Sequence, residues 1–140
     1  MTGFDVSKYA DAGLLLIRCV LGPMFLYYGL PKLMAGPGAW REVGSAVNAV
    51  GIFFWPVFWG FLASVVMAAG GLCVLTGIFF RPACFFLFLV MAVAASMHFS
   101  KGQGLMAAAH AIEDGAVFLG LVFVGPGRWV MAFWPAKATL

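Results

Sequence analysis

The residues most able to do chemistry in this sequence are a few ionisable side chains inside long apolar segments. Arg18 stands within residues 13–33, GLLLIRCVLGPMFLYYGLPKL, and the motif HAIEDG places His110, Glu113 and Asp114 at positions i, i+3 and i+4 of a later segment. A charge in apolar surroundings is costly unless it finds a partner or water. These residues are therefore the first candidates for a functional site.

We expect Arg18 to form a buried ion pair with Glu113 or Asp114. Counted at 1.5 Å per helical residue, Arg18 lies ~9 Å and Glu113 ~17 Å from the same side of the molecule. The axial gap of ~8 Å is within the combined reach of the two side chains if their helices are neighbours. The pair would either lock the helices together or form the floor of a polar cavity or proton path.

A second group of candidates lies nearer the opposite side. It comprises Tyr28, Lys32, His98 and His110. Two imidazoles, a phenol and an ammonium can line a pocket for a polar headgroup, while phenylalanine-rich segments accommodate an isoprenoid tail. Alternatively, Tyr28 and Lys32 are interfacial anchors and the histidines satisfy local hydrogen bonds. With two histidines and no adjacent ligand motif, no metal site is expected.

The segments that carry these residues are those of an integral membrane protein. Of the 140 residues, 64% are hydrophobic and 9% are charged, against roughly 25% charged in a typical soluble domain. The bilayer is therefore an expected partner, and a net charge of +3 is too small for a nucleic-acid-binding surface. Cys19, Cys73 and Cys84 form no CxxC pair, which disfavours a thiol relay.

Hydropathy and helix-breaking residues predict an all-α fold, a four-transmembrane-helix bundle. The expected spans are about 12–33, 54–80, 83–99 and 105–124, within one membrane domain of residues 1–140. Between the first two spans, residues 34–51 repeat apolar side chains at helical spacing, which predicts an interfacial helix. We expect Arg81 and Pro82 to form the turn between the second and third spans, and residues 129–140 to form a short amphipathic segment.

One stripe of the first span is predicted to face the bundle. Arg18, Gly22, Phe25, Gly29 and Lys32 fall at i, i+4, i+7, i+11 and i+14. Small residues on such a stripe allow a neighbouring helix to approach closely. This is therefore the expected inner face of the first helix.

Four spans place both termini on one side of the membrane, which we expect to be the cytoplasmic side. The terminal side carries Lys8, Arg81, Arg128 and Lys137, whereas the other side carries Lys32, Arg41 and Lys101. Basic residues are enriched in cytoplasmic loops, so this difference of one charge favours cytoplasmic termini.

The order and spacing of several motifs resemble the DoxX-like family of small four-helix membrane proteins. The resemblance extends over LLLIRCVLGPMFLYYGLPKL in the first span, AAGGLCVLTGIFFRPAC at 68–84, and a glutamate followed by GPGR at 125–128. The matching positions are Arg18, Gly22, Gly29, Lys32, Gly70, Gly71, Gly77, Arg81 and Glu113. Together these motifs cover nearly the whole chain.

Two positions depart from the family pattern. Tyr28 stands where the family often has a histidine, and Met67 stands where it often has a glutamate. Glu113 and Asp114 are consequently the only acids expected inside the spans. The resemblance implies a four-helix protein of a bacterial inner membrane, in some members a subunit of thiosulfate:quinone oxidoreductase and in others part of oxidative-stress complexes.

We therefore expect a quinone-interacting or accessory membrane subunit of an oxidoreductase complex. No covalently bound cofactor is implied, and a quinone is the expected ligand. Because no residue set here transfers electrons by itself, a redox partner subunit or a homo-oligomer is expected as well. A structural or assembly scaffold of a membrane complex and a small-molecule permease are the alternatives.

Overall fold

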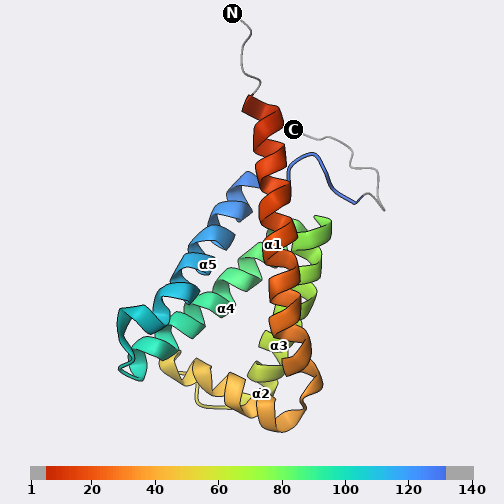
Figure 1. The fold of residues 1–140 in the computed structure, drawn as a ribbon. Coiled ribbons are helices and arrows are strands. Elements are labelled where there is room, and N and C mark those ends of the chain that lie inside the picture. Colours follow the sequence, from red (N-terminus) through yellow and green to blue (C-terminus); the bar gives the residue numbers. More distant parts are fainter. Residues whose placement is uncertain (1–5, 132–140) are drawn as a thin grey trace, which may run out of the picture.

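The computed structural model describes residues 6–131, and all regular structure in this part of the chain is helical (Figure 1). The elements are α1 (Val6–Met34), α2 (Pro37–Gly44), the 3₁₀ helix η1 (Ser45–Val50), α3 (Pro56–Thr76), α4 (Phe80–Ser100) and α5 (Gly104–Val124). The predicted all-α architecture with four long apolar helices is confirmed. The interfacial helix expected between the first two spans is also present, as α2 continued by η1.

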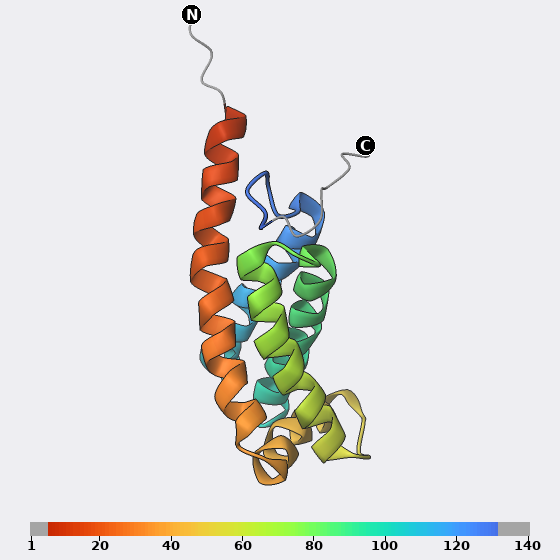
Figure 2. The ribbon, with the colours of Figure 1, turned by 90° about the vertical axis from the view of Figure 1, so that its right-hand side faces the viewer.

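The helices pack as two pairs, α1 with α3 and α4 with α5 (Figures 1 and 2). The α2–η1 segment lies across one end of the molecule, and the ends of the described chain lie at the other. Within residues 6–131, four helices are long and apolar enough to cross a membrane: Tyr9–Met34, Pro56–Thr76, Phe80–Ser100 and Gly104–Val124. The predicted segment over 129–140, including Lys137, lies largely outside the described residues.

Helices α1 and α3 approach closely because small residues line their interface. A Cβ atom added to Gly22 would lie 2.7 Å from Leu75 Cβ and 2.9 Å from the carbonyl oxygen of Gly71. Arg18 and Phe25 on the same stripe are 1% and 2% exposed. The stripe predicted for the first helix does face the bundle, although Lys32 at its end is only half-buried.

The turn between α3 and α4 was predicted in the wrong place. Helix α3 ends at Thr76 because Gly77, at φ 81°, adopts the left-handed conformation typical of a helix C-terminus. Helix α4 begins at Phe80, so Arg81 and Pro82 belong to its first turn. Proline is tolerated there because the N–H it lacks would have no intrahelical acceptor.

Large aromatic side chains separate α1 from α5. No Cα atom of α1 comes within 8 Å of a Cα atom of α5 in the described residues. The two helices meet instead through rings: the centroids of Phe25 and Phe118 lie 4.8 Å apart, and both residues are buried. In Figure 1 the helices converge towards the end that holds the termini and diverge towards α2. We call the line along which α1 and α5 face each other the α1–α5 seam, and the candidate site lies on it.

Candidate functional site

Arg18 is buried in a cage of backbone carbonyl groups. Its Nε donates to the carbonyl oxygen of Val74 at 2.9 Å, and its Nη2 donates to that of Leu75 at 2.9 Å. Its Nη1 donates to the carbonyl oxygens of Pro126 and Trp129, at 3.0 and 2.5 Å. Four of the five N–H donors of the guanidinium are thereby satisfied.

The end of α3 explains why a cation fits at this position. Val74 and Leu75 belong to the last turn of α3, where carbonyl groups have no intrahelical partner. These carbonyl groups also form the negative end of the helix dipole. The guanidinium therefore caps α3 from the neighbouring helix α1, and the ring of Phe80 lies 5.9 Å from its central carbon.

The segment that follows α5 is held by Arg18 and by two further contacts. Asp11 of α1 accepts a hydrogen bond from the backbone N–H of Arg128 at 3.1 Å, and its carboxylate lies 3.5 Å from the Arg128 side chain. The N–H of Met131 donates to the carbonyl oxygen of Thr76 at 2.9 Å. Residues 125–131 are thus fastened to α1 and α3.

The predicted ion pair between Arg18 and Glu113 or Asp114 is wrong. No described carboxylate lies within ion-pair distance of the guanidinium, and Glu113 is exposed on α5. Helix α1 begins well beyond the end of the bundle (Figure 2), so a count from its first apolar residue places Arg18 too deep. Arg18 lies level with the end of α3, whereas Glu113 lies ~17 Å from the end of α5, at 1.5 Å per residue.

A different group of ionisable residues comes together on the α1–α5 seam. His110 Nε2 lies 3.4 Å from Asp114 Oδ2, one helical turn along α5. The ring of Tyr28 on α1 packs edge-to-face against that of His110, with centroids 6.4 Å apart. Lys32 follows Tyr28 by one turn on the same side of α1. The structure thus brings together Tyr28 and His110, two of the four predicted ligand-binding residues, with Lys32 nearby.

His98 does not join this group. Its Nδ1 lies 2.6 Å from Oε1 of Gln103, in the turn between α4 and α5. That bond agrees with the alternative interpretation, in which the histidines form local hydrogen bonds and do not bind a ligand. Among the described residues, no contact joins His98 to Tyr28, Lys32 or His110.

An apolar groove of about 330 Å³ continues the seam towards the termini. It is lined by Leu16, Ile17, Val20, Leu21 and Val117. Val117 follows Glu113 by four residues and Asp114 by three, so it shares their side of α5. The seam is therefore apolar at one end and ionisable at the other, and about two helical turns separate the groove from Tyr28 and His110.

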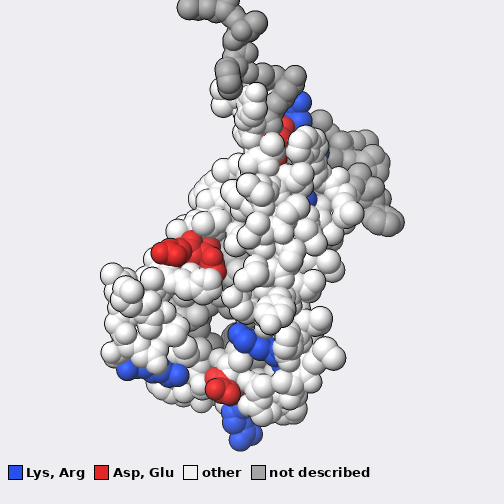
Figure 3. Space-filling model, viewed as in Figure 1, with Lys and Arg blue, Asp and Glu red and all other residues white. Residues whose placement is uncertain are grey.

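Of the two acidic residues of α5, Glu113 is exposed and Asp114 is half-buried. Figure 3 shows two adjacent acidic side chains on the surface over α5, surrounded by uncharged residues, and the surface is hollowed between this pair and α1. Glu113 forms no ion pair or hydrogen bond with a described residue. It lies near the middle of a helix long enough to span a membrane.

Sequence reasoning missed the carbonyl cage and the role of Asp11. Backbone carbonyl groups belong to every residue, so no pattern of residue types marks Val74 or Pro126 as a partner of Arg18. One signal was available: the glycines of GPGR predict a tight loop, and a loop following the last span comes close to the start of the first.

Four membrane-length helices and a fully buried arginine at one end define this protein as a four-helix integral membrane protein. The DoxX family model matches residues 13–100, and the chain belongs to the DoxX family. Searches of curated proteins and of solved structures return no significant match.

Proposed function

We propose that this DoxX family protein binds a quinone headgroup on the α1–α5 seam and serves as an accessory membrane subunit of an oxidoreductase complex. The observation that carries the proposal is the meeting of Tyr28 and His110 across two helices, on the same seam as an apolar groove that begins about two helical turns away. Quinones combine a polar ring with an apolar tail. A seam that is ionisable at one end and apolar at the other suits both parts.

The residues around the seam have the hydrogen-bonding groups that a quinone ring requires. Its carbonyl oxygens accept hydrogen bonds, and the hydroxyl of Tyr28 and the ammonium of Lys32 have no partner among the described residues. Asp114 faces Nε2 of His110 and orients the imidazole, so that Nδ1 donates to a quinone carbonyl oxygen when the ring is protonated. A bound quinone supplies two-electron chemistry, and the His110–Asp114 pair would hold a proton beside it.

The proposal includes a redox partner, because side chains of these types do not by themselves supply electrons. Glu113 supports it: an exposed carboxylate near the middle of a span is costly in lipid and is relieved by a polar group of a neighbouring chain. We place the complex in a bacterial inner membrane with both termini of this chain in the cytoplasm. Labelling of single cysteines introduced at Lys101 and at Arg128 with an impermeant thiol reagent tests this topology, and labelling of Lys101→Cys from the cytoplasmic side would refute it.

Quinone retained through mild purification tests the binding site directly. We expect Tyr28→Phe and His110→Ala each to lower bound quinone, the second by about tenfold for the loss of one hydrogen bond from a charged imidazole. His98→Ala is the matched control, because His98 bonds to Gln103 away from the seam. Equal loss in His98→Ala and His110→Ala, or no bound quinone in the wild-type protein, would refute the proposal.

An assembly role is the second candidate, and the exposed Glu113 is the observation that favours it. In that case Glu113→Gln releases the partner chain, while Tyr28→Phe and His110→Ala leave the complex and its activity intact. Co-purification of partner chains with each variant separates the two functions. If Tyr28→Phe or His110→Ala abolishes the oxidoreductase activity of a complex that still assembles, the result would support quinone binding over a purely structural role.

A further inference from the structure

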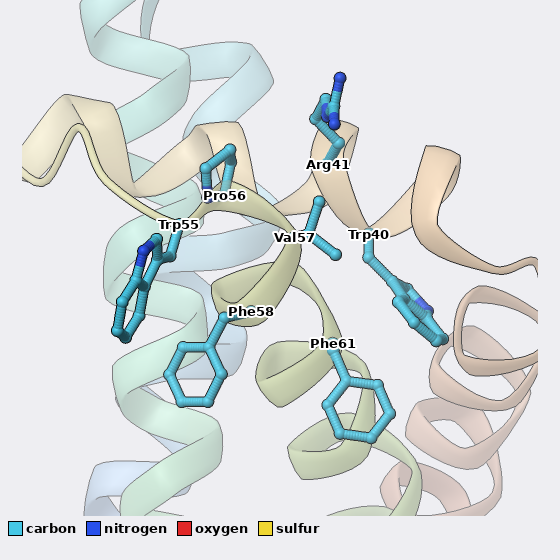
Figure 4. Close-up of a pocket in the computed structure, with 7 residues that line it drawn as sticks. All are labelled: Trp40, Arg41, Trp55, Pro56, Val57, Phe58 and Phe61. Atoms are coloured by element: carbon cyan, nitrogen blue, oxygen red, sulfur yellow. The ribbon is translucent and has the colours of Figure 1, made fainter.

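A second groove lies at the end of the molecule opposite the termini, between α2 and the start of α3. Its volume is about 530 Å³. Trp40 and Arg41 of α2 line it, together with Trp55, Pro56, Val57, Phe58 and Phe61 (Figure 4). The groove shares no lining residue with the groove on the α1–α5 seam, and the inference drawn from it does not depend on the proposed function.

Backbone contacts between α2 and α3 form the groove in advance of any ligand. Gly44 lies against the carbonyl group of Pro56, and Gly60 lies against the carbonyl group of Trp40, so closely that neither position has room for a Cβ atom. The indole N–H of Trp40 donates to the carbonyl oxygen of Lys32 at 3.0 Å. The ring of Trp40 also packs edge-to-face on Phe61 at 4.9 Å. One wall of the groove is therefore fixed.

Trp55 holds the opposite side of the groove in a strained conformation. Its φ of 52° and ψ of 53° lie in the left-handed region, which is unfavourable for a bulky residue. Its side chain is 71% exposed, so burial of the ring within the protein does not compensate for the strain. Backbone strain of this kind persists where the surrounding structure enforces it, and it is concentrated at ligand sites.

The lining residues are arranged with the polarity of a membrane interface. In Figure 4 the rings of Trp40, Phe58 and Phe61 point along α3, into the membrane-spanning part of the molecule, and Arg41 points the opposite way. Arg41 is exposed and forms no ion pair or hydrogen bond with a described residue. The neighbouring Glu42 is not among the lining residues.

We infer that this groove is a binding site for an anionic phospholipid. The phosphate of the lipid pairs with the guanidinium of Arg41, and the glycerol backbone and one acyl chain lie along the aromatic rings. Basic residues at a membrane interface attract anionic headgroups, and tryptophan side chains are enriched at that depth. Because acyl chains are as apolar as the groove, selectivity among lipids comes from the headgroup and therefore from Arg41.

Native mass spectrometry of the protein taken from nanodiscs tests this inference. The discs contain phosphatidylglycerol and phosphatidylcholine with identical acyl chains. We expect the wild-type protein to retain phosphatidylglycerol preferentially, Arg41→Gln to lower that preference about fivefold and Arg41→Lys to keep most of it. Lys101→Gln is the matched control, because Lys101 is an exposed cation on the same side of the membrane and outside the groove.

Three outcomes would overturn the inference. Equal effects of Arg41→Gln and Lys101→Gln would mean that only the overall surface charge attracts the lipid. Displacement of the lipid by soluble glycerol phosphate would mean that the groove itself holds no acyl chain. A photoactivatable phosphatidylglycerol added to the wild-type protein should label residues 40–61. Uniform labelling of all lipid-facing helices would refute the site, and this test requires no variant.

Discussion

Arg18→Gln tests the carbonyl cage as the main fastening at the end of the bundle that holds the termini. The guanidinium makes four hydrogen bonds to carbonyl groups, and a glutamine amide offers two N–H donors, so at least two carbonyl groups lose their donor. Hydrogen bonds between transmembrane helices contribute about 0.6 kcal/mol on average and about 1.7 at most. We therefore expect the free energy of unfolding to fall by roughly 1–3 kcal/mol.

Reversible unfolding in mixed detergent micelles, followed by circular dichroism, measures this loss. Arg81→Gln is the matched control, because Arg81 is an exposed arginine at the same end with no hydrogen bond or ion pair to a described residue. It should cost less than about 0.5 kcal/mol. Arg18→Lys should also be destabilising, because a single ammonium group cannot reproduce the fork of the guanidinium.

A double-mutant cycle separates the carbonyl cage from an ion pair with Glu113. Because Arg18 and Glu113 do not touch, the effects of Arg18→Gln and Glu113→Gln should add to within about 0.5 kcal/mol. A coupling energy above about 1 kcal/mol, or an effect of Arg18→Gln no larger than that of Arg81→Gln, would refute the structural reasoning.

Three further predictions concern the fastening of the helices and loops. Asp11→Asn should weaken the contact with Arg128 and speed proteolysis within residues 125–131, and an unchanged cleavage rate in limited proteolysis would contradict this role. Gly71→Leu should separate α1 from α3, because a Cβ atom at Gly71 would lie 2.7 Å from the carbonyl oxygen of Gly22; a thermal melt unchanged from wild type would exclude close packing at this point. Phe79, at φ 48° and 77% exposed, has a backbone conformation that favours glycine. Phe79→Gly should therefore raise the free energy of unfolding by about 1 kcal/mol, and Phe79→Val should lower it.

The spans, the helix between the first two spans and the inner face of α1 could all be predicted from the sequence. These features follow from local regularities: apolar length set by the bilayer, helix-breaking residues between spans, and small residues repeated at helical spacing. Hydropathy does not locate the end of a helix within an apolar run, which is why the turn at Gly77 was misplaced. The left-handed backbone of that glycine, and not a change in polarity, ends α3.

The partners of Arg18, by contrast, could not be predicted without the tertiary structure. The expectation of an ion pair assumed that a buried cation requires a carboxylate, but the carbonyl groups at the end of a neighbouring helix meet the same need. That solution depends on the axial offset of α1 against α3, which side-chain types do not encode. Likewise, Tyr28 and His110 meet because the tertiary structure places α1 opposite α5, where the rings of Phe25 and Phe118 also pack together. The chemistry of each residue can be read from the sequence, whereas its partners depend on how the helices are placed.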